Sequence, residues 1–324
     1  MSVADNIDYP PLLRRPAVFL SGVGVLFLLL LRADAAHWAP VHGLFGALAL
    51  TGLEAGPANG LAAALVAALI GLNVWVITGL KTRWQMWIVW LELAALVAIL
   101  FVSFDLSYAF IRRKLWILIS IGLVNTLLIS ACSIVLAFVL ALAGAIAKLS
   151  GNGIALGIAN FYTSLFRGIP LLMQIYLIYL GLPQVGIVVD AIPAGIAALS
   201  LCYGAYMTEI FRGGIESIPR GQWEAARALG FKPGDTLFRI ILPQAMRVII
   251  PPTGNQFIAM LKDSSLVSVV GVWELMYLAR TQGQAEFRHI EMMITASVIY
   301  WAFSIALEMV QARIERRFGR DHVR

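Results

Sequence analysis

Long apolar runs, separated by short charged segments, are the feature that most limits what this chain can fold into. Such runs recur from residue 17 to residue 311. A helix of about 20 residues crosses the hydrocarbon core of a bilayer, and it satisfies its own backbone groups there. With 60% hydrophobic and only 13% charged residues, the chain has too little polar material to cover itself in water. We therefore expect an all-α polytopic membrane protein.

The apolar runs predict about eight transmembrane helices, at residues 17–31, 60–80, 84–104, 116–147, 161–182, 191–211, 248–279 and 290–311. The first run is short, but Arg32 can extend it by reaching toward the headgroups. The seventh contains Pro251-Pro252 and the polar stretch 262–265, so we expect one bent crossing there rather than two spans. Between the first two runs, residues 33–58 are expected to form a loop with an interfacial or re-entrant piece at 43–52.

The distribution of lysine and arginine predicts the orientation of these spans. Placing the N-terminus in the cytoplasm puts 17 of the 24 Lys and Arg residues in cytoplasmic segments. The cluster Arg112-Arg113-Lys114 is the exception, since this orientation puts it outside. Either a short interfacial helix on the outer surface holds the cluster, or one span is miscounted. We expect both termini in the cytoplasm.

A charged segment, residues 212–247, interrupts the apolar pattern. Ala225, Ala226 and Ala228 keep its first half thin, and Glu224 adds a charge that can accept hydrogen bonds. A partner protein could approach such a surface closely. From the residues alone, two interpretations stay open: a socket for a partner protein, and a surface helix stabilised only by its own chain.

The local pattern of this segment predicts two short helices. Ser217 is placed to cap the first, and Gly230 to stop it after about 9 residues. Pro233-Gly234 predicts a turn. A residue at 235–236 can cap the second helix, which we expect to end before Pro243.

The same segment resembles the signature loop of binding-protein-dependent ABC importer permeases. The matching pattern is Glu224-Ala225-Ala226, three residues, Gly230, nine residues, and Ile240-x-Leu242-Pro243. In that family the loop is a coupling helix that docks into a groove on the cytoplasmic ATPase. The resemblance implies that the ATPase-coupling residues are Glu224, Ala225, Ala226, Gly230, Leu242 and Pro243.

Flanking stretches resemble the permeases for polar amino acids, of the histidine/glutamine/arginine/glutamate type. They include residues 166–172, 205–213 and 261–269. The resemblance implies a five-helix permease core preceded by three extra helices. We accordingly predict an N-terminal extension with three transmembrane helices at 1–116, an ABC importer transmembrane domain at 117–317 that includes the coupling loop 212–247, and a basic cytoplasmic tail at 318–324.

The nucleotide is expected to bind elsewhere. The chain lacks the phosphate-binding pattern G-x-x-x-x-G-K-[ST], so we expect no catalytic residue and no cofactor or metal in this chain. The resemblance implies two ABC ATPase subunits that bind ATP and Mg, a second permease chain, identical or similar, and an extracytoplasmic amino-acid-binding protein. It also implies a multi-pass protein of the bacterial cytoplasmic (inner) membrane, with an amino-acid substrate and no nucleic-acid partner.

Polar side chains inside the spans are candidates for the substrate path, because unpaired polar groups are costly in lipid. Tyr203, Tyr206 and Glu209 recur every three residues on one helix face. Glu209 either attracts a substrate amino group or pairs with Arg212. The full set of candidates is Asn125, Thr126, Gln174, Tyr203, Tyr206, Glu209, Asn255, Gln256 and Lys262.

Ala137, Ala141 and Ala145, four residues apart, predict a close contact between helices.

The alternative class is a gradient-driven secondary transporter of small polar solutes, which usually places charged pairs at mid-membrane. The acidic residues inside the spans are few and isolated, and the coupling pattern would then be unexplained. A membrane enzyme would need a nucleophile–base or metal-ligand arrangement, and the four histidines form no such set.

Overall fold

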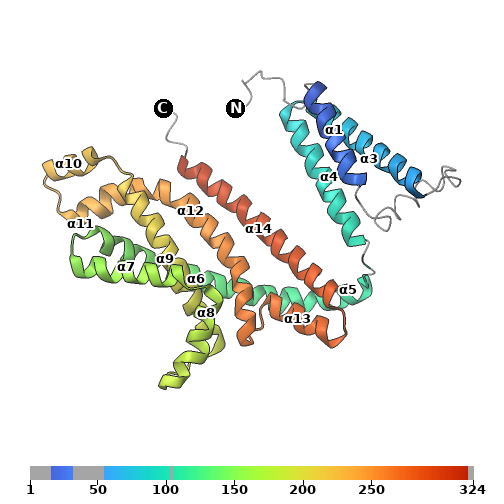
Figure 1. Ribbon diagram of the computed structural model, residues 1–324. Helices are drawn as coiled ribbons and strands as arrows, with labels where there is room; N and C mark the ends of the chain where they lie inside the picture. Colours follow the sequence, from blue (N-terminus) through green and yellow to red (C-terminus); the bar gives the residue numbers. More distant parts are fainter. Residues whose placement is uncertain (1–15, 32–54, 103, 105, 320–324) are drawn as a thin grey trace. The chain divides into compact units, whose positions relative to one another are not determined.

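The computed structural model describes residues 16–31, 55–102, 104 and 106–319, which form helices and turns with no strand among them (Figure 1). This confirms the all-α class. The chain separates into two compact units, residues 1–105 and 106–324. Within the described residues, three helices are long and apolar enough to cross a membrane, or four if one bent pair counts as a crossing. The count of eight spans therefore stays a prediction.

The described part of the first unit consists of α1 (Pro16–Leu31), α3 (Ala55–Thr78) and α4 (Thr82–Val102). Gly71 lets α1 approach α3 closely, since a Cβ there would lie 2.7 Å from Val23 Cγ2. Asn73 Nδ2 donates to Glu92 Oε1 over 2.7 Å and so joins α3 to α4. A bond of this kind gives two polar groups a partner within an apolar hairpin. The interfacial piece expected at 43–52 lies outside the described residues.

The second unit opens with one uninterrupted helical run of 42 residues, Tyr108–Leu149. It comprises α5 (Tyr108–Ile117), the π-helical η4 (Leu118–Leu123) and α6 (Val124–Leu149). Ser107 caps the run by accepting a hydrogen bond from Phe110 N. The cluster Arg112-Arg113-Lys114, which the charge rule does not explain, lies in α5. Arg113 and Lys114 both contact Glu286, at 2.5 and 3.1 Å.

The next apolar segment breaks in its middle. The helix α7 (Gly153–Gly168) ends before Pro170, and α8 (Leu171–Tyr176) restarts the run, followed by η5 (Leu177–Gly181) and η6 (Leu182–Val185). The two halves differ in direction by 106°. Ile169 is extended, with φ −95° and ψ 133°, because the ring of a following proline disfavours helical backbone. The span expected at 161–182 is thus a bent pair of helices, and it stays a prediction that this pair crosses the membrane.

The centre of the second unit is α9 (Ala191–Glu216), which packs along α6 and also contacts α7, α8 and α12. Ala137, Ala141 and Ala145 of α6 are fully buried in the core shared with α9. This confirms the close helix contact that their spacing predicts. Gly144 adds to it, since a Cβ there would lie 2.6 Å from Thr208 Oγ1 of α9.

The charged segment folds into α10 (Arg220–Ala228), α11 (Pro233–Asp235) and the π-helical η7 (Thr236–Ile241), at the end where α9 leads into α12 (Leu242–Asp263) (Figure 1). The helix α10 has the expected 9 residues. Gly230 ends it with φ +78°, a left-handed backbone that glycine adopts without strain. Phe231 N then donates to Ala226 O over 3.1 Å and closes the helix end.

Two details of this segment differ from expectation. Ser217 does not cap α10: its hydroxyl donates to Gly214 O over 2.7 Å, at the end of α9, where carbonyls lack helical partners. Pro219 precedes α10 without a side-chain cap. The second helix does not end before Pro243, because helical backbone runs on from residue 233 to residue 263. The π-helical turn just before Pro243 widens the helix where the ring must fit.

The chain closes with η8 (Ser264–Val270), α13 (Leu275–Ala285) and the long α14 (His289–Gly319). Glu274 caps α13 by accepting hydrogen bonds from Met276 N and Tyr277 N, at 2.9 and 2.6 Å. Tyr300 of α14 donates to the same carboxylate over 2.8 Å. The bent crossing expected at 248–279 is thus several pieces: α12, the short η8 and the first part of α13.

Candidate functional site

A cavity of about 460 Å³ lies at the break between α7 and α8. The break supplies one wall, from Arg167 to Leu171. The remaining lining residues come from α9 and α12, and they are Cys202, Tyr203, Tyr206, Gln256 and Asp263. The change of direction between α7 and α8 therefore forms one side of the cavity.

The cavity carries both signs of charge. The guanidinium of Arg167 lies over the ring of Tyr206, 5.3 Å from its centroid. Tyr203 donates its hydroxyl to Asp263 Oδ2 over 2.7 Å. Each charged group is therefore oriented by an aromatic residue of α9. A cavity with one guanidinium and one carboxylate can hold a small molecule that itself carries a carboxylate and an ammonium group.

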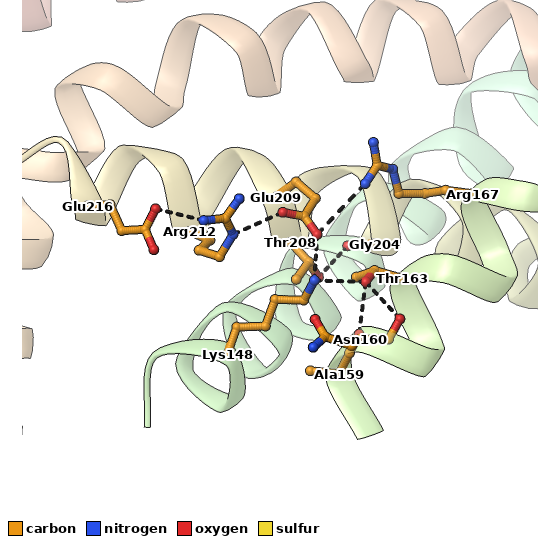
Figure 2. Close-up of polar contacts among 10 residues, drawn as sticks. All are labelled: Lys148, Ala159, Asn160, Thr163, Arg167, Gly204, Thr208, Glu209, Arg212 and Glu216. Atoms are coloured by element: carbon orange, nitrogen blue, oxygen red, sulfur yellow. Dashed lines mark hydrogen bonds and ion pairs between the residues drawn. The ribbon is translucent and has the colours of Figure 1, made fainter. Parts of the chain in front are cut away.

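Beside the cavity, Glu209 of α9 gathers cations from three helices, as Figure 2 shows. Lys148 Nζ, from the end of α6, donates to Glu209 Oε1 over 2.5 Å, and also to Thr163 Oγ1 of α7 over 2.9 Å. Arg212 Nε donates to Glu209 Oε2 over 3.0 Å. Arg167 faces the same carboxylate at 3.7 Å. This cluster joins α6, α7 and α9.

The cluster extends along α9 toward the coupling loop. Arg212 Nη1 also donates to Glu216 Oε2, over 2.7 Å. Glu216 is the last residue of α9, and α10 starts four residues later. A continuous chain of charged contacts thus leads from Arg167, at the cavity, to the start of the loop.

Of the predicted path residues, the structure brings Tyr203, Tyr206 and Gln256 together at the cavity. Glu209 lies beside it and pairs with Arg212, the second of its two predicted roles. The three-residue spacing identified Tyr203, Tyr206 and Glu209, and Gln256 was named as a polar residue inside a span, but Arg167 and Asp263 were not identified as lining a site. A signal for Arg167 was present in the sequence: a cation directly before Gly168-Ile169-Pro170, where an apolar helix must break.

The other predicted path residues have partners elsewhere. Asn125 Nδ2 donates to Trp273 O over 2.7 Å, and the Thr126 hydroxyl accepts from Leu275 N over 3.1 Å. Gln174 lies beneath the helix break, where Nε2 donates to Phe166 O and Ile169 O at 2.9 and 2.8 Å. Asn255 accepts a hydrogen bond from Gln311. Lys262 is exposed and is not among the cavity's lining residues.

A second cavity, of about 540 Å³, lies at the charged loop. Its lining residues are Arg220, Trp223, Glu224, Arg227, Pro233 and Thr236. The Thr236 hydroxyl is buried and has no hydrogen-bond partner among the described residues. Glu224 is exposed, whereas Ala226 faces inward and is buried. The loop therefore presents a charged, hollowed surface of its own.

No candidate metal site is present in the part of the chain that the structure describes. In residues 16–31, 55–102, 104 and 106–319, no three His, Cys, Asp or Glu side chains are grouped so that they could hold a metal ion. Cys132 and Cys202 are both free cysteines.

Comparison with known proteins gives a consistent result. A family model described as "Binding-protein-dependent transport system inner membrane component" matches residues 134–320. The L-cystine transport system permease protein TcyB of Bacillus subtilis (strain 168) is 39% identical over 211 residues, 65% of this chain and 90% of TcyB. The arginine transport system permease protein ArtQ of the same organism is 38% identical, over 60% of this chain and 90% of ArtQ.

Solved structures are also similar to this chain. A crystal structure titled as an amino acid ABC transporter with histidines is 34% identical, with a TM-score of 0.62. The similarity covers 66% of this chain and 100% of that chain. The inward-facing MetNI methionine ABC transporter, at 21% identity and a TM-score of 0.55, shares the fold.

Proposed function

This chain belongs to the family of binding-protein-dependent transport system inner membrane components, and we propose that it carries a polar amino acid into the cell. It is the permease subunit of an ABC importer, without catalytic activity of its own, and the ATPase is a separate partner. The names of relatives that transport cystine, arginine and histidine support an amino acid as the substrate. Family membership disfavours the gradient-driven alternative.

The observation that carries the proposal is the pair of opposite charges on the cavity at the α7–α8 break. Arg167 would bind the α-carboxylate of the substrate, and Asp263, oriented by Tyr203, would bind its ammonium group. Tyr206 and Gln256 line the same space and would contact the side chain. A cavity of about 460 Å³ is large enough for one amino acid.

The loop with α10 is proposed to be the contact with the ATPase. Glu224, Ala225 and Ala226 would form the docking surface, and Gly230 the turn that follows it. Leu242 and Pro243 would start the helix that returns into the membrane domain. In support, Glu224 is exposed and lines the second cavity. A helix this short and this exposed buries little apolar surface within its own chain, as expected of a surface that a partner completes.

ABC importer permeases generally work with an ATPase and a substrate-binding protein. We propose two ATPase subunits that bind ATP and Mg, and a second permease chain facing this one. The apolar helices and the family place the chain in a membrane, and we propose the bacterial cytoplasmic membrane with both termini inside, which the Lys and Arg distribution supports. Residues 1–116 would be an added three-helix extension, 117–317 the importer domain and 318–324 a cytoplasmic tail.

Substrate binding by the purified permease–ATPase complex tests the cavity. The probes are L-arginine, L-histidine, L-glutamine and L-cystine, and the tightest binder is used with the variants. Arg167→Gln and Asp263→Asn should each weaken binding by about tenfold or more, as expected for the loss of a hydrogen bond to a charged group. The controls are Arg113→Gln and Glu286→Gln. They disrupt the ion pair between Arg113 of α5 and Glu286, which follows α13. Unchanged affinity in both cavity variants would show that the substrate binds elsewhere.

A further inference from the structure

Arg167 lies between two sites. It lines the cavity, and it also faces Glu209 of the neighbouring cluster (Figure 2). Its contact with Glu209, at 3.7 Å, is longer than a hydrogen bond. Lys148 and Arg212 hydrogen-bond the same carboxylate at 2.5 and 3.0 Å. Glu209 would therefore keep two charged partners if Arg167 moved away.

We propose that Arg167 is shared between Glu209 and the substrate: it faces Glu209 while the cavity is empty and turns to the substrate's carboxylate when the cavity fills. This inference rests on the proposed function, because it requires the substrate to occupy this cavity. The Arg167 side chain is 43% exposed, so no close packing prevents its rotation. Tyr206 contacts the guanidinium and lines the cavity, and a planar guanidinium can shift over an aromatic face while keeping the contact.

The charge balance of the cluster favours this exchange. Lys148, Arg167 and Arg212 supply three positive charges, and Glu209 and Glu216 supply two negative ones. The group thus carries a surplus of one positive charge. A carboxylate arriving in the cavity neutralises that surplus, and Glu209 stays paired, so the exchange leaves no carboxylate without a partner.

The exchange would also connect the cavity to the coupling loop. Glu209 contacts Arg212, and Arg212 contacts Glu216, the last residue of α9 before α10. When Arg167 turns to the substrate, Glu209 keeps Lys148 and Arg212 as partners. The contacts from Glu209 through Arg212 to Glu216 then have one positive charge fewer beside them. Arg167 is then a substrate-binding residue with two states, and a two-state element is what coupling between two sites requires.

The test is whether removal of the Glu209 carboxylate tightens substrate binding rather than weakening it. If Glu209 competes with the substrate for Arg167, then Glu209→Gln should tighten binding of L-arginine, by up to about fivefold, the equivalent of an exposed ion pair. L-Argininamide, which lacks the carboxylate, should show no such gain. In the Arg167→Gln background, Glu209→Gln should have no effect. The matched control is Glu286→Gln, which removes another carboxylate held by two cations.

Weaker or unchanged binding of L-arginine by a folded Glu209→Gln complex would overturn the sharing of Arg167. Weaker binding would instead favour a direct contact between Glu209 and the substrate's ammonium group. Thermal unfolding of the complex establishes that the variant is folded. If it is not, Glu209→Asp keeps the charge on a shorter side chain, and loss of its longest contact should still tighten binding.

The two proposals fail in different ways. If Arg167→Gln and Asp263→Asn leave affinity unchanged, the cavity is not the substrate site. If both weaken binding while Glu209→Gln and Glu209→Asp give no gain, the cavity holds the substrate, but Arg167 is not shared.

Discussion

The consecutive helices α9 and α10 have opposite surroundings. Of the 26 residues of α9, 14 are buried, including the bulky side chains Phe211 and Met207. Of the 9 residues of α10, only Ala226 is buried. The first helix finds its partners within the chain, on α6, α7, α8 and α12. The second meets little of its own chain, so its surface is available to another protein.

Charged contacts run along the part of α9 that leads into α10. Glu209, Arg212 and Glu216 follow each other along the last turns of α9 and lead toward α10. A closely packed helix transmits a change at the cavity with little deformation, and an exposed helix passes it to a partner. The contrast predicts that changes in α9 affect folding or binding, whereas changes in α10 affect only coupling to the ATPase.

The largest effect is expected in the loop. Glu224→Lys and Gly230→Arg should abolish most ATP-driven uptake while the protein stays in the membrane. Glu224→Lys reverses a charge at the proposed docking surface, a change worth more than about tenfold in affinity. Gly230→Arg places a side chain at φ +78°, which costs about 1–2 kcal/mol of local strain. Uptake and ATP hydrolysis are measured in proteoliposomes, and membrane protein by immunoblot.

Gly153→Arg is the matched control for the loop variants. Gly153 starts α7, and a Cβ there meets nothing within 4 Å. It should retain uptake. Full transport by both loop variants would remove this loop as the point of contact with the ATPase.

An intermediate effect is expected from one glycine of α9. Gly204→Ala should destabilise the protein by about 1–3 kcal/mol, the cost of overfilling a packed site. The new Cβ would lie 2.6 Å from Tyr162 Oη and 3.0 Å from Leu140 Cβ. Tyr162 is held by its hydrogen bond to Leu201 O, so it cannot move freely. Thermal unfolding in detergent measures the change.

Gly213→Ala, in the same helix, is the comparison. Nothing lies within 4 Å of a Cβ at Gly213, and alanine stabilises a helix by about 0.5–1 kcal/mol relative to glycine. The two variants should therefore shift the unfolding temperature in opposite directions. Equal shifts would mean that α9 is packed less tightly at Gly204 than its neighbours indicate.

The smallest effect is expected at the cavity's acidic wall. Tyr203→Phe removes the hydroxyl that donates to Asp263 but keeps the ring. Loss of one such hydrogen bond, about 1 kcal/mol, should weaken amino-acid binding a few-fold. Tyr206→Phe keeps the ring beneath Arg167 and should leave affinity unchanged. Equilibrium binding to the complex measures both, and a larger loss for Tyr206→Phe would reverse the assignment of the two tyrosines.

Much of the architecture could be predicted, because it depends on local or periodic properties. Apolar length predicts the all-helical class, and the spacing of Ala137, Ala141 and Ala145 predicts the contact of α6 with α9. Gly230 ends α10 because a left-handed residue is needed there. The prediction that Ser217 caps α10 was wrong. A serine between two helices can hydrogen-bond either the end of the first or the start of the second, and sequence spacing does not decide between them.

Amino-acid composition and local patterns predict a helical chain that is apolar enough for a membrane and has a charged loop, and the spaced pattern of that loop resembles ABC importer permeases. Those properties follow from composition, period and a long spaced pattern within one segment. Which charged side chains contact one another depends on the packing of the helices. Lys148, Arg167, Glu209 and Asp263 come from four different helices, and no local pattern relates them. Their encounter depends on the 106° break at Pro170 and on the close packing of α9, because these bring the side chains within reach.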